Sequence, residues 1–129
     1  MKCPVCESEK VSTFFKDLST CSDCTHIFKN DPVIHNLKTY FNLEHYSELT
    51  APLTTLYEQL ETGTEFEFIF PSVVFYGNRL SAEIYTEDIN HYFTQNSMMR
   101  LMYKIGFKVR KQDVRWSGNL CETFLRVVK

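Results

Sequence analysis

The 129-residue sequence has no long apolar run and no large excess of charge of either sign. No stretch approaches the roughly 18 apolar residues that a membrane-spanning helix needs, and residues 1–6 lack the apolar region of a signal peptide. The formal net charge of −2 lacks the basic excess typical of surfaces that bind nucleic acid or anionic membranes. We therefore expect a cytoplasmic protein with no membrane partner, for which nucleic acid is a disfavoured ligand.

Glycine is also scarce, with only four residues, at positions 63, 77, 106 and 118, and none of them belongs to a GxGxxG or similar cluster. Nucleotide-binding folds use such a cluster to bring the backbone close to a phosphate. A site of that kind is therefore not encoded. The hydrophobic content of 43%, with 11 Phe and 7 Tyr, still provides enough material for a packed core, so we expect a folded chain.

Cysteine shows the strongest pattern in the sequence. Two CxxC pairs, Cys3 with Cys6 and Cys21 with Cys24, are separated by 14 residues. This spacing is typical of zinc sites, and in a reducing cytoplasm paired cysteines indicate metal more often than disulfides. Four thiolates complete a tetrahedron around one Zn²⁺ and leave no position for water or substrate, so the predicted site is structural.

Other interpretations of the cysteines stay open at this point. Two disulfides or a redox-active CxxC are the alternative to the metal. His26, two residues after Cys24, is the only nearby residue that could replace a cysteine as ligand. Cys121 lies in a strand-like apolar run, where we expect a small buried residue rather than a reactive thiol.

The remaining sequence predicts an α+β fold in three parts. Residues 1–32 predict a zinc ribbon, 33–62 a helical connection, and 63–129 a small mixed sheet of three strands with helices. In the ribbon we expect strands at 11–18 and 25–29, and in the connection a helix with Pro52 in its first turn and Gly63 beyond its end. The third part begins with a strand at 64–70 that Pro71 terminates. A helix at 98–105, capped by Thr94 or Ser97 and ended by Gly106, then precedes a hairpin of 107–116 with 120–128.

Several of these segments resemble one known family. The CxxC pairs and the aromatic segment from Tyr40 to Tyr46 resemble the zinc-binding N-terminal region of certain class I S-adenosylmethionine-dependent methyltransferases, including sugar C-methyltransferases. One departure is that those knuckles commonly carry Gly after the second cysteine, where Glu7 and Thr25 stand here. The C-terminal part resembles the end of the same enzymes: 60–73 the segment of their fifth strand, 88–94 a recurrent loop, 97–109 the following helix, and the hairpin their last two strands.

The resemblance implies an enzyme whose cofactor-binding half is missing here. The family binds S-adenosylmethionine in the first half of a doubly wound domain, but only about 20 residues separate Tyr46 from Phe66, and a βαβ unit needs about 30. We therefore expect structural Zn²⁺ as cofactor, no S-adenosylmethionine site, and a non-catalytic binding or assembly module. The alternatives are a methyltransferase, or a subunit of one, acting on a small molecule such as a sugar, and a nucleic-acid-binding zinc ribbon.

Two sets of polar residues are candidates for other sites. His91 and Tyr92 occupy the recurrent loop where the resembled enzymes place substrate-facing groups, which makes them the candidate catalytic residues, although a packing role is favoured. A basic cluster is interleaved with Phe107 and Trp116, and strand alternation predicts that its members divide between two faces, as expected of a solvated strand. The cluster consists of Lys104, Lys108, Arg110, Lys111 and Arg115.

The predicted strand at 64–70 suggests how the protein meets a partner. In the resembled fold the corresponding strand is interior, but the preceding sequence is too short to supply its neighbour. One edge of the strand is then left with unpaired backbone groups, and natural proteins rarely leave a long apolar edge bare. We therefore predict a homodimer, or a partner protein, at an open sheet edge.

Overall fold

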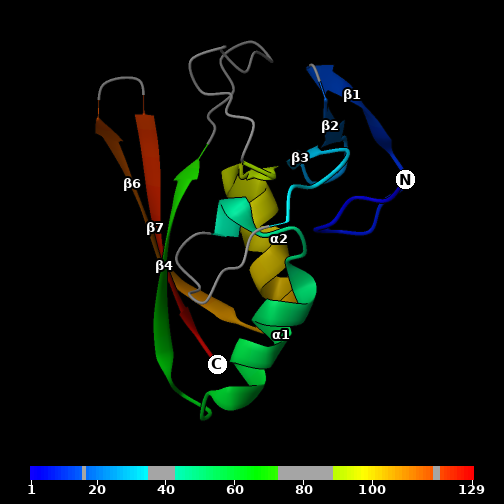
Figure 1. Cartoon of the computed structure of the whole chain (residues 1–129). Coiled ribbons are helices and arrows are strands. Elements are labelled where there is room, and N and C mark those ends of the chain that lie inside the picture. The colour runs from blue at the N-terminus through cyan, green and yellow to red at the C-terminus, as the bar shows by residue number, and fades with distance from the viewer. Residues whose placement is uncertain (16, 35–42, 73–88, 118–119) are drawn as a thin grey trace.

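The computed structural model describes residues 1–15, 17–34, 43–72, 89–117 and 120–129. Within these ranges the chain forms two antiparallel sheets and two α-helices, an α+β arrangement (Figure 1). One sheet has the strand order β1-β2-β3-β5 and the other has the order β4-β7-β6. The helices lie beside one face of the β4-β7-β6 sheet, between it and the N-terminal strands (Figure 1).

The N-terminal sheet is built from three short consecutive strands, β1 (Val11–Phe15), β2 (Leu18–Cys21) and β3 (Ile27–Lys29). The prediction of one strand over 11–18 was wrong, because the chain reverses between β1 and β2 and places Val11 opposite Cys21. Asp17, a residue type favoured in turns, lies at this reversal.

A fourth strand comes from far along the sequence. Strand β5 (His91–Tyr92) pairs antiparallel with β3, with Tyr92 opposite Ile27 and His91 opposite Phe28. The segment was predicted as a loop, since two residues are too few to show a strand pattern. The N-terminal sheet therefore reaches beyond the predicted boundary of the ribbon at residue 32.

The helices occupy the middle of the chain. A 3-10 turn, η1 (Leu43–His45), precedes α1 (Thr50–Gln59), and α2 spans Gln95–Ile105. The predicted cap of α2 is confirmed with both residues taking part: Thr94 Oγ1 accepts from the Ser97 backbone N–H at 3.0 Å, and Ser97 Oγ accepts from the Thr94 N–H at 3.0 Å. This reciprocal capping box starts the helix three residues before the predicted Met98.

The C-terminal sheet consists of β4 (Glu65–Ser72), β6 (Lys108–Ser117) and β7 (Leu120–Val128). The hairpin prediction is confirmed, but the prediction of a mixed sheet was wrong, because β7 lies between the other two and both described pairings are antiparallel. Pro71 does not end β4, which continues to Ser72 with Pro71 opposite Glu122. Proline is tolerated there because β4 is an edge strand of this sheet, where one side needs no donor.

One hydrophobic core joins the two ends of the chain. It contains Cys3, Cys21 and Cys24 together with Phe68 and Leu125, and all five are almost fully buried. The N-terminal strands and the C-terminal sheet therefore share their packing. No helix in the described part of the chain is long and apolar enough to cross a membrane.

Candidate metal centre

The structure brings the four predicted cysteine ligands together. Their sulfur atoms all lie within 4.8 Å of one another. Cys3 Sγ is 3.6 Å from Cys24 Sγ, and Cys6 Sγ is 3.5 Å from Cys21 Sγ. A zinc ion with Zn–S bonds of about 2.3 Å has sulfurs about 3.8 Å apart in a tetrahedron, so this donor set fits such an ion with small adjustments. All four cysteines are free thiols, which does not agree with the two-disulfide alternative.

Two matching backbone turns place these sulfurs. The Glu7 N–H donates to the Cys3 carbonyl at 2.9 Å, and the Thr25 N–H donates to the Cys21 carbonyl at 3.0 Å. Glu7 and Thr25 have φ values of 64° and 65°, the left-handed region in which glycine is the favoured residue. The missing glycines therefore leave the turn geometry unchanged, at the cost of some backbone strain.

The thiols interact with one another and with the backbone. Cys3 Sγ and Cys24 Sγ share a hydrogen bond, which lowers the pKa of Cys3 to about 5 and raises the pKa of Cys24. Burial raises the pKa of Cys6. The Val5 N–H also donates to Cys3 Sγ, at 3.4 Å.

The second knuckle is docked onto the N-terminus of α2. The Thr25 hydroxyl donates to the Cys24 carbonyl and lies 2.7 Å from Thr94 Oγ1, the N-cap of the helix. The Asn96 side-chain amide donates to the same Cys24 carbonyl at 3.2 Å. The residues that follow the last cysteine thus connect the sulfur cluster directly to the helix cap.

His26 is not a substitute ligand but part of a buried chain of polar side chains. Its Nδ1 lies 3.1 Å from Ser97 Oγ and its Nε2 lies 3.0 Å from His91 Nδ1. Burial, and secondarily the charge of His91, lowers the pKa of His26, and burial lowers the pKa of His91 to about 4. Both imidazoles are therefore neutral at physiological pH. Their hydrogen bonds connect His26, the residue before β3, to β5 and to α2.

The two candidate catalytic residues, His91 and Tyr92, are both buried in β5. Tyr92 packs with Leu18 and Ile27 in a small second cluster. His91 contributes to the lining of a cavity of about 160 Å³, smaller than the usual range for small-molecule sites, and its Nε2 is buried without a hydrogen bond. Their contacts are those of sheet pairing and packing, and the titratable side chain that meets His91 among the described residues is the buried His26, at 3.0 Å.

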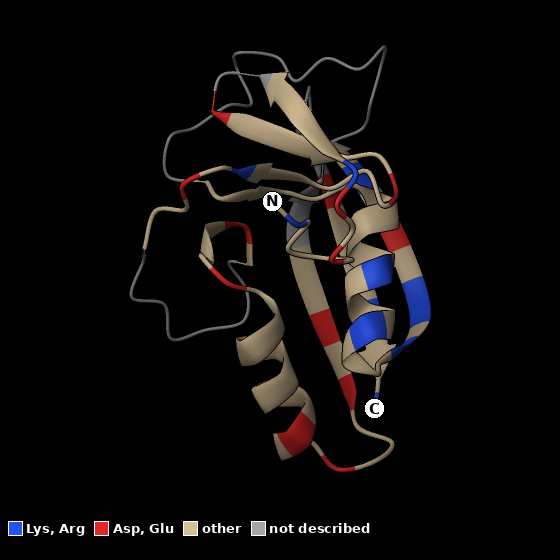
Figure 2. Cartoon of the chain, turned by 90° about the vertical axis from the view of Figure 1, so that its right-hand side faces the viewer, with Lys and Arg blue, Asp and Glu red and all other residues tan. Residues whose placement is uncertain are grey.

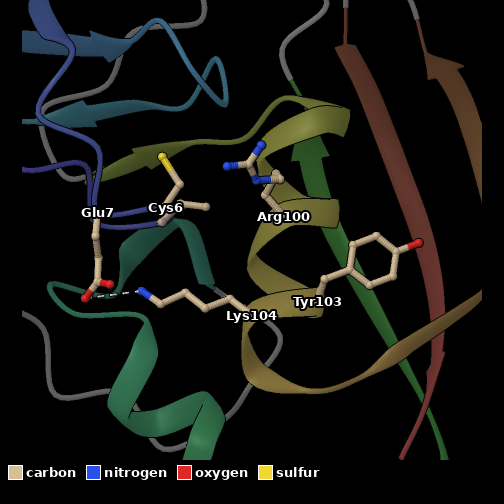
Figure 3. A pocket seen from close by; sticks show the side chains of 6 residues that line it. Cys6, Glu7, Arg100, Tyr103 and Lys104 are labelled. Atoms are coloured by element: carbon tan, nitrogen blue, oxygen red, sulfur yellow. Dashed lines mark ion pairs between the residues drawn. The ribbon is translucent and has the colours of Figure 1, made fainter.

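A larger cavity of about 390 Å³ opens beside the sulfur cluster, between the first knuckle and α2 (Figure 3). Cys6 forms part of its wall, and the described sulfur ligands other than Cys6 are almost fully buried. Across the cavity, α2 contributes Arg100, Tyr103 and Lys104, and the Lys104 ammonium lies 3.7 Å from the Glu7 carboxylate. The spacing of Arg100 and Lys104, one helical turn apart, can be seen in the sequence. The sequence does not indicate that this side of α2 packs against the first knuckle.

The predicted basic cluster does not form one surface. Lys104 lies on α2 at this cavity, whereas the others belong to β6. The prediction that Lys108 and Lys111 face opposite sides was wrong: a register shift between Val109 and Lys111 places them opposite Val128 and Arg126, on one face.

That face of the sheet is balanced in charge. Ion pairs join Arg126 to Glu67 at 3.5 Å and Lys111 to Asp113 at 3.4 Å. The Arg115 guanidinium stacks over the Phe124 ring. Figure 2 shows the acidic residues that lie along β4, the strand that follows α1. These pairings are typical of a solvated sheet face rather than of a polyanion-binding surface.

Two further predictions stand outside these observations. The side chain of Cys121 lies outside the described residues, although its backbone belongs to β7 opposite Trp116. The aromatic segment at Tyr40 and Phe41, part of the family resemblance, also lies outside them.

No family model, curated protein or solved structure matches this chain. The methyltransferase resemblance is therefore carried by the residues of the sequence alone.

Proposed function

We propose that this chain is a zinc-stabilised, methyltransferase-like binding or assembly module of the cytoplasm, without a catalytic activity of its own. The observation that carries the proposal is the set of four thiols within 4.8 Å of one another. Soft thiolate donors in a tetrahedral set favour Zn²⁺. Four protein ligands close the coordination sphere, so the ion would hold the fold together rather than act on a substrate.

The C-terminal part supports the comparison with the methyltransferase end. The segments that carry the resemblance occur as β4, α2, β6 and β7, in the expected order along the chain. The helix that occupies the short connection, α1, runs from Thr50 to Gln59, close to the start of β4 at Glu65. The described part of this connection is a 3-10 turn and a helix, which supports a module built from the end of such a domain.

The metal is tested by elemental analysis of protein purified under reducing conditions. We expect one zinc per chain, because four thiolates satisfy one tetrahedral ion. Cys6→Ser and Cys24→Ser should each lose the metal and unfold the N-terminal sheet, since binding free energy of a structural zinc is folding free energy. Cys121→Ser is the matched control and should keep its zinc. A zinc-free wild-type protein in which all five cysteines are reduced would refute the metal site.

The alternative activity is tested by calorimetric titration with S-adenosylmethionine. A module without the cofactor-binding half should show no heat of binding and no thermal shift. Saturable binding at micromolar concentration would replace the proposal with a methyltransferase, or a subunit of one, acting on a small molecule such as a sugar. Retention on heparin that weakens steeply with salt would instead favour the nucleic-acid-binding alternative.

We further propose that the partner of the module binds at the edge of β4. Among the described residues β4 pairs only with β7, so no described strand lies along its other side. An uncovered strand edge offers backbone donors and acceptors to a partner. Ile69 on this strand is 37% exposed. A second copy of the chain is the favoured occupant, because symmetric dimers are the commonest closed assemblies.

A further inference from the structure

The sulfur cluster raises a problem of charge once a metal binds. Four thiolates and one Zn²⁺ carry a net charge of −2, whereas four thiols carry none. Cys3, Cys21 and Cys24 are each at most 1% exposed, and burying an uncompensated charge is costly. Backbone N–H groups of Val5, Ser8 and His26 hydrogen-bond to the sulfurs of Cys3, Cys6 and Cys24, respectively. These neutral amides supply only part of the compensation, because they carry no formal charge.

Two positively charged side chains of α2 lie beside the site of this negative charge. Arg100 and Lys104 lie one helical turn apart on α2 and line the same cavity as Cys6. Figure 3 shows the Arg100 guanidinium extending from the helix toward the side of the cavity formed by Cys6, with Lys104 reaching across to Glu7. Both side chains therefore point from α2 to the first knuckle.

We propose that Arg100 and Lys104 are the counter-charges of a zinc–tetrathiolate centre and set its affinity for the metal. The proposal rests on the zinc site proposed above. Cations beside the cavity stabilise the centre in its doubly negative, metal-bound form more than in its protonated, metal-free form. They therefore favour zinc binding, and they do so from α2, which contributes no ligand.

An anionic ligand in the cavity is the competing assignment for the same two cations. The Glu7 carboxylate already lies 3.7 Å from the Lys104 ammonium, on the side where such a ligand would bind. The adjacent centre would add negative charge of its own. A further anion would meet repulsion from both, so the counter-charge role is the better fit.

The test measures zinc affinity by competition with a chromophoric chelator at fixed pH and low salt. The double variant Arg100→Gln/Lys104→Gln should bind zinc more weakly, by about two- to fivefold for each charge removed, the size expected for charges that are partly screened by solvent. Its affinity should also depend less on salt than that of the wild type, because the lost attraction is the screened part. Glutamine keeps good helix propensity, so α2 should remain folded.

Two further variants separate this effect from a general change in charge. Lys108→Gln/Lys111→Gln removes the same net charge from the outer face of β6, away from the cavity, and should leave the affinity within about twofold. Glu7→Gln removes a negative charge beside Cys6 and should strengthen zinc binding by a similar factor to the loss of one cation.

The result that overturns the inference is an Arg100→Gln/Lys104→Gln variant whose zinc affinity and salt dependence match those of the β6 control pair. Weaker binding in both pairs alike would also overturn it, since the effect would then be one of net charge alone. A wild-type chain that binds no zinc would refute the metal site itself. That outcome differs from one in which zinc binds but its affinity does not depend on Arg100 and Lys104.

Discussion

Thr25 is one of the two described non-glycine residues with a positive φ, and the only one of the two that is β-branched. A β-branched residue at a φ of 65° is rare, and the conformation costs on the order of 1–2 kcal/mol. The hydroxyl contacts to the Cys24 carbonyl and to Thr94 hold it there. A glycine would relieve the strain but would lose both contacts, so threonine at this position connects the cysteine knuckle to α2.

Replacing Thr25 tests this connection. Thr25→Val keeps the branched shape and the strain but removes the hydroxyl, and should lower the free energy of unfolding by about 1–3 kcal/mol. Thr25→Ser keeps the hydroxyl and should remain close to the wild type. Denaturant unfolding of the metal-loaded proteins measures both. Equal stability of the Val and Ser variants would show that the hydroxyl contacts contribute nothing.

His91 gives the protein a pH dependence of known sign. Burial lowers its pKa to about 4, below the usual value of about 6.5. As the pH falls below 6.5, the His91 imidazole becomes protonated in the unfolded chain but stays neutral in the folded chain. The free energy of unfolding therefore falls by up to about 1.4 kcal/mol per pH unit until about pH 4. An NMR titration should find the His91 imidazole neutral down to about pH 5, and a midpoint near 6 would contradict the prediction.

Among the elements, α2 and α1 meet at a glycine. Gly106 ends α2 with a φ of 121°, and a Cβ there would come within 3.0 Å of the Tyr57 ring of α1. Gly106→Ala should therefore destabilise the fold by roughly 2–3 kcal/mol, combining backbone strain with displacement of the ring. Gly63→Ala is the control: its φ is 91° but nothing lies within 4 Å, so only about 1 kcal/mol is expected. Thermal unfolding measures the stability of both variants. An equal loss of stability in the two would show that the contact with the Tyr57 ring has no effect.

The elements that the sequence predicted well are those defined by neighbouring residues. The cap of α2 depends on Thr94 and Ser97, three residues apart, and the β6–β7 hairpin depends on two adjoining runs. The four thiols were predictable for the same reason, since each CxxC pair forms its own turn. Strand β5 was missed because its partner β3 lies far away in the sequence, and the bulge near Arg110 was missed because it leaves no mark on composition.

For the whole molecule, the edge of β4 makes self-association testable. Light scattering at micromolar concentration should give a dimer, and Ile69→Lys should shift it toward monomer, because a charge on an edge strand opposes pairing. Glu61→Lys, in the exposed turn before β4, is the control for added charge and should stay dimeric. A wild-type monomer whose amides at 65–70 exchange slowly would show that the edge is covered within one chain.

The pairing of β3 with β5 also bears on how the protein is made. The cysteines and β3 leave the ribosome first, whereas His91 and Tyr92 follow only after most of the chain has been synthesised. A metal captured early would thus organise knuckles whose outermost strand still lacks its neighbour, with the His26 ring uncovered. During that interval the edge of β3 in the nascent chain has no pairing strand and is open to aggregation. Rapid elongation through the middle of the sequence shortens the interval and so limits aggregation.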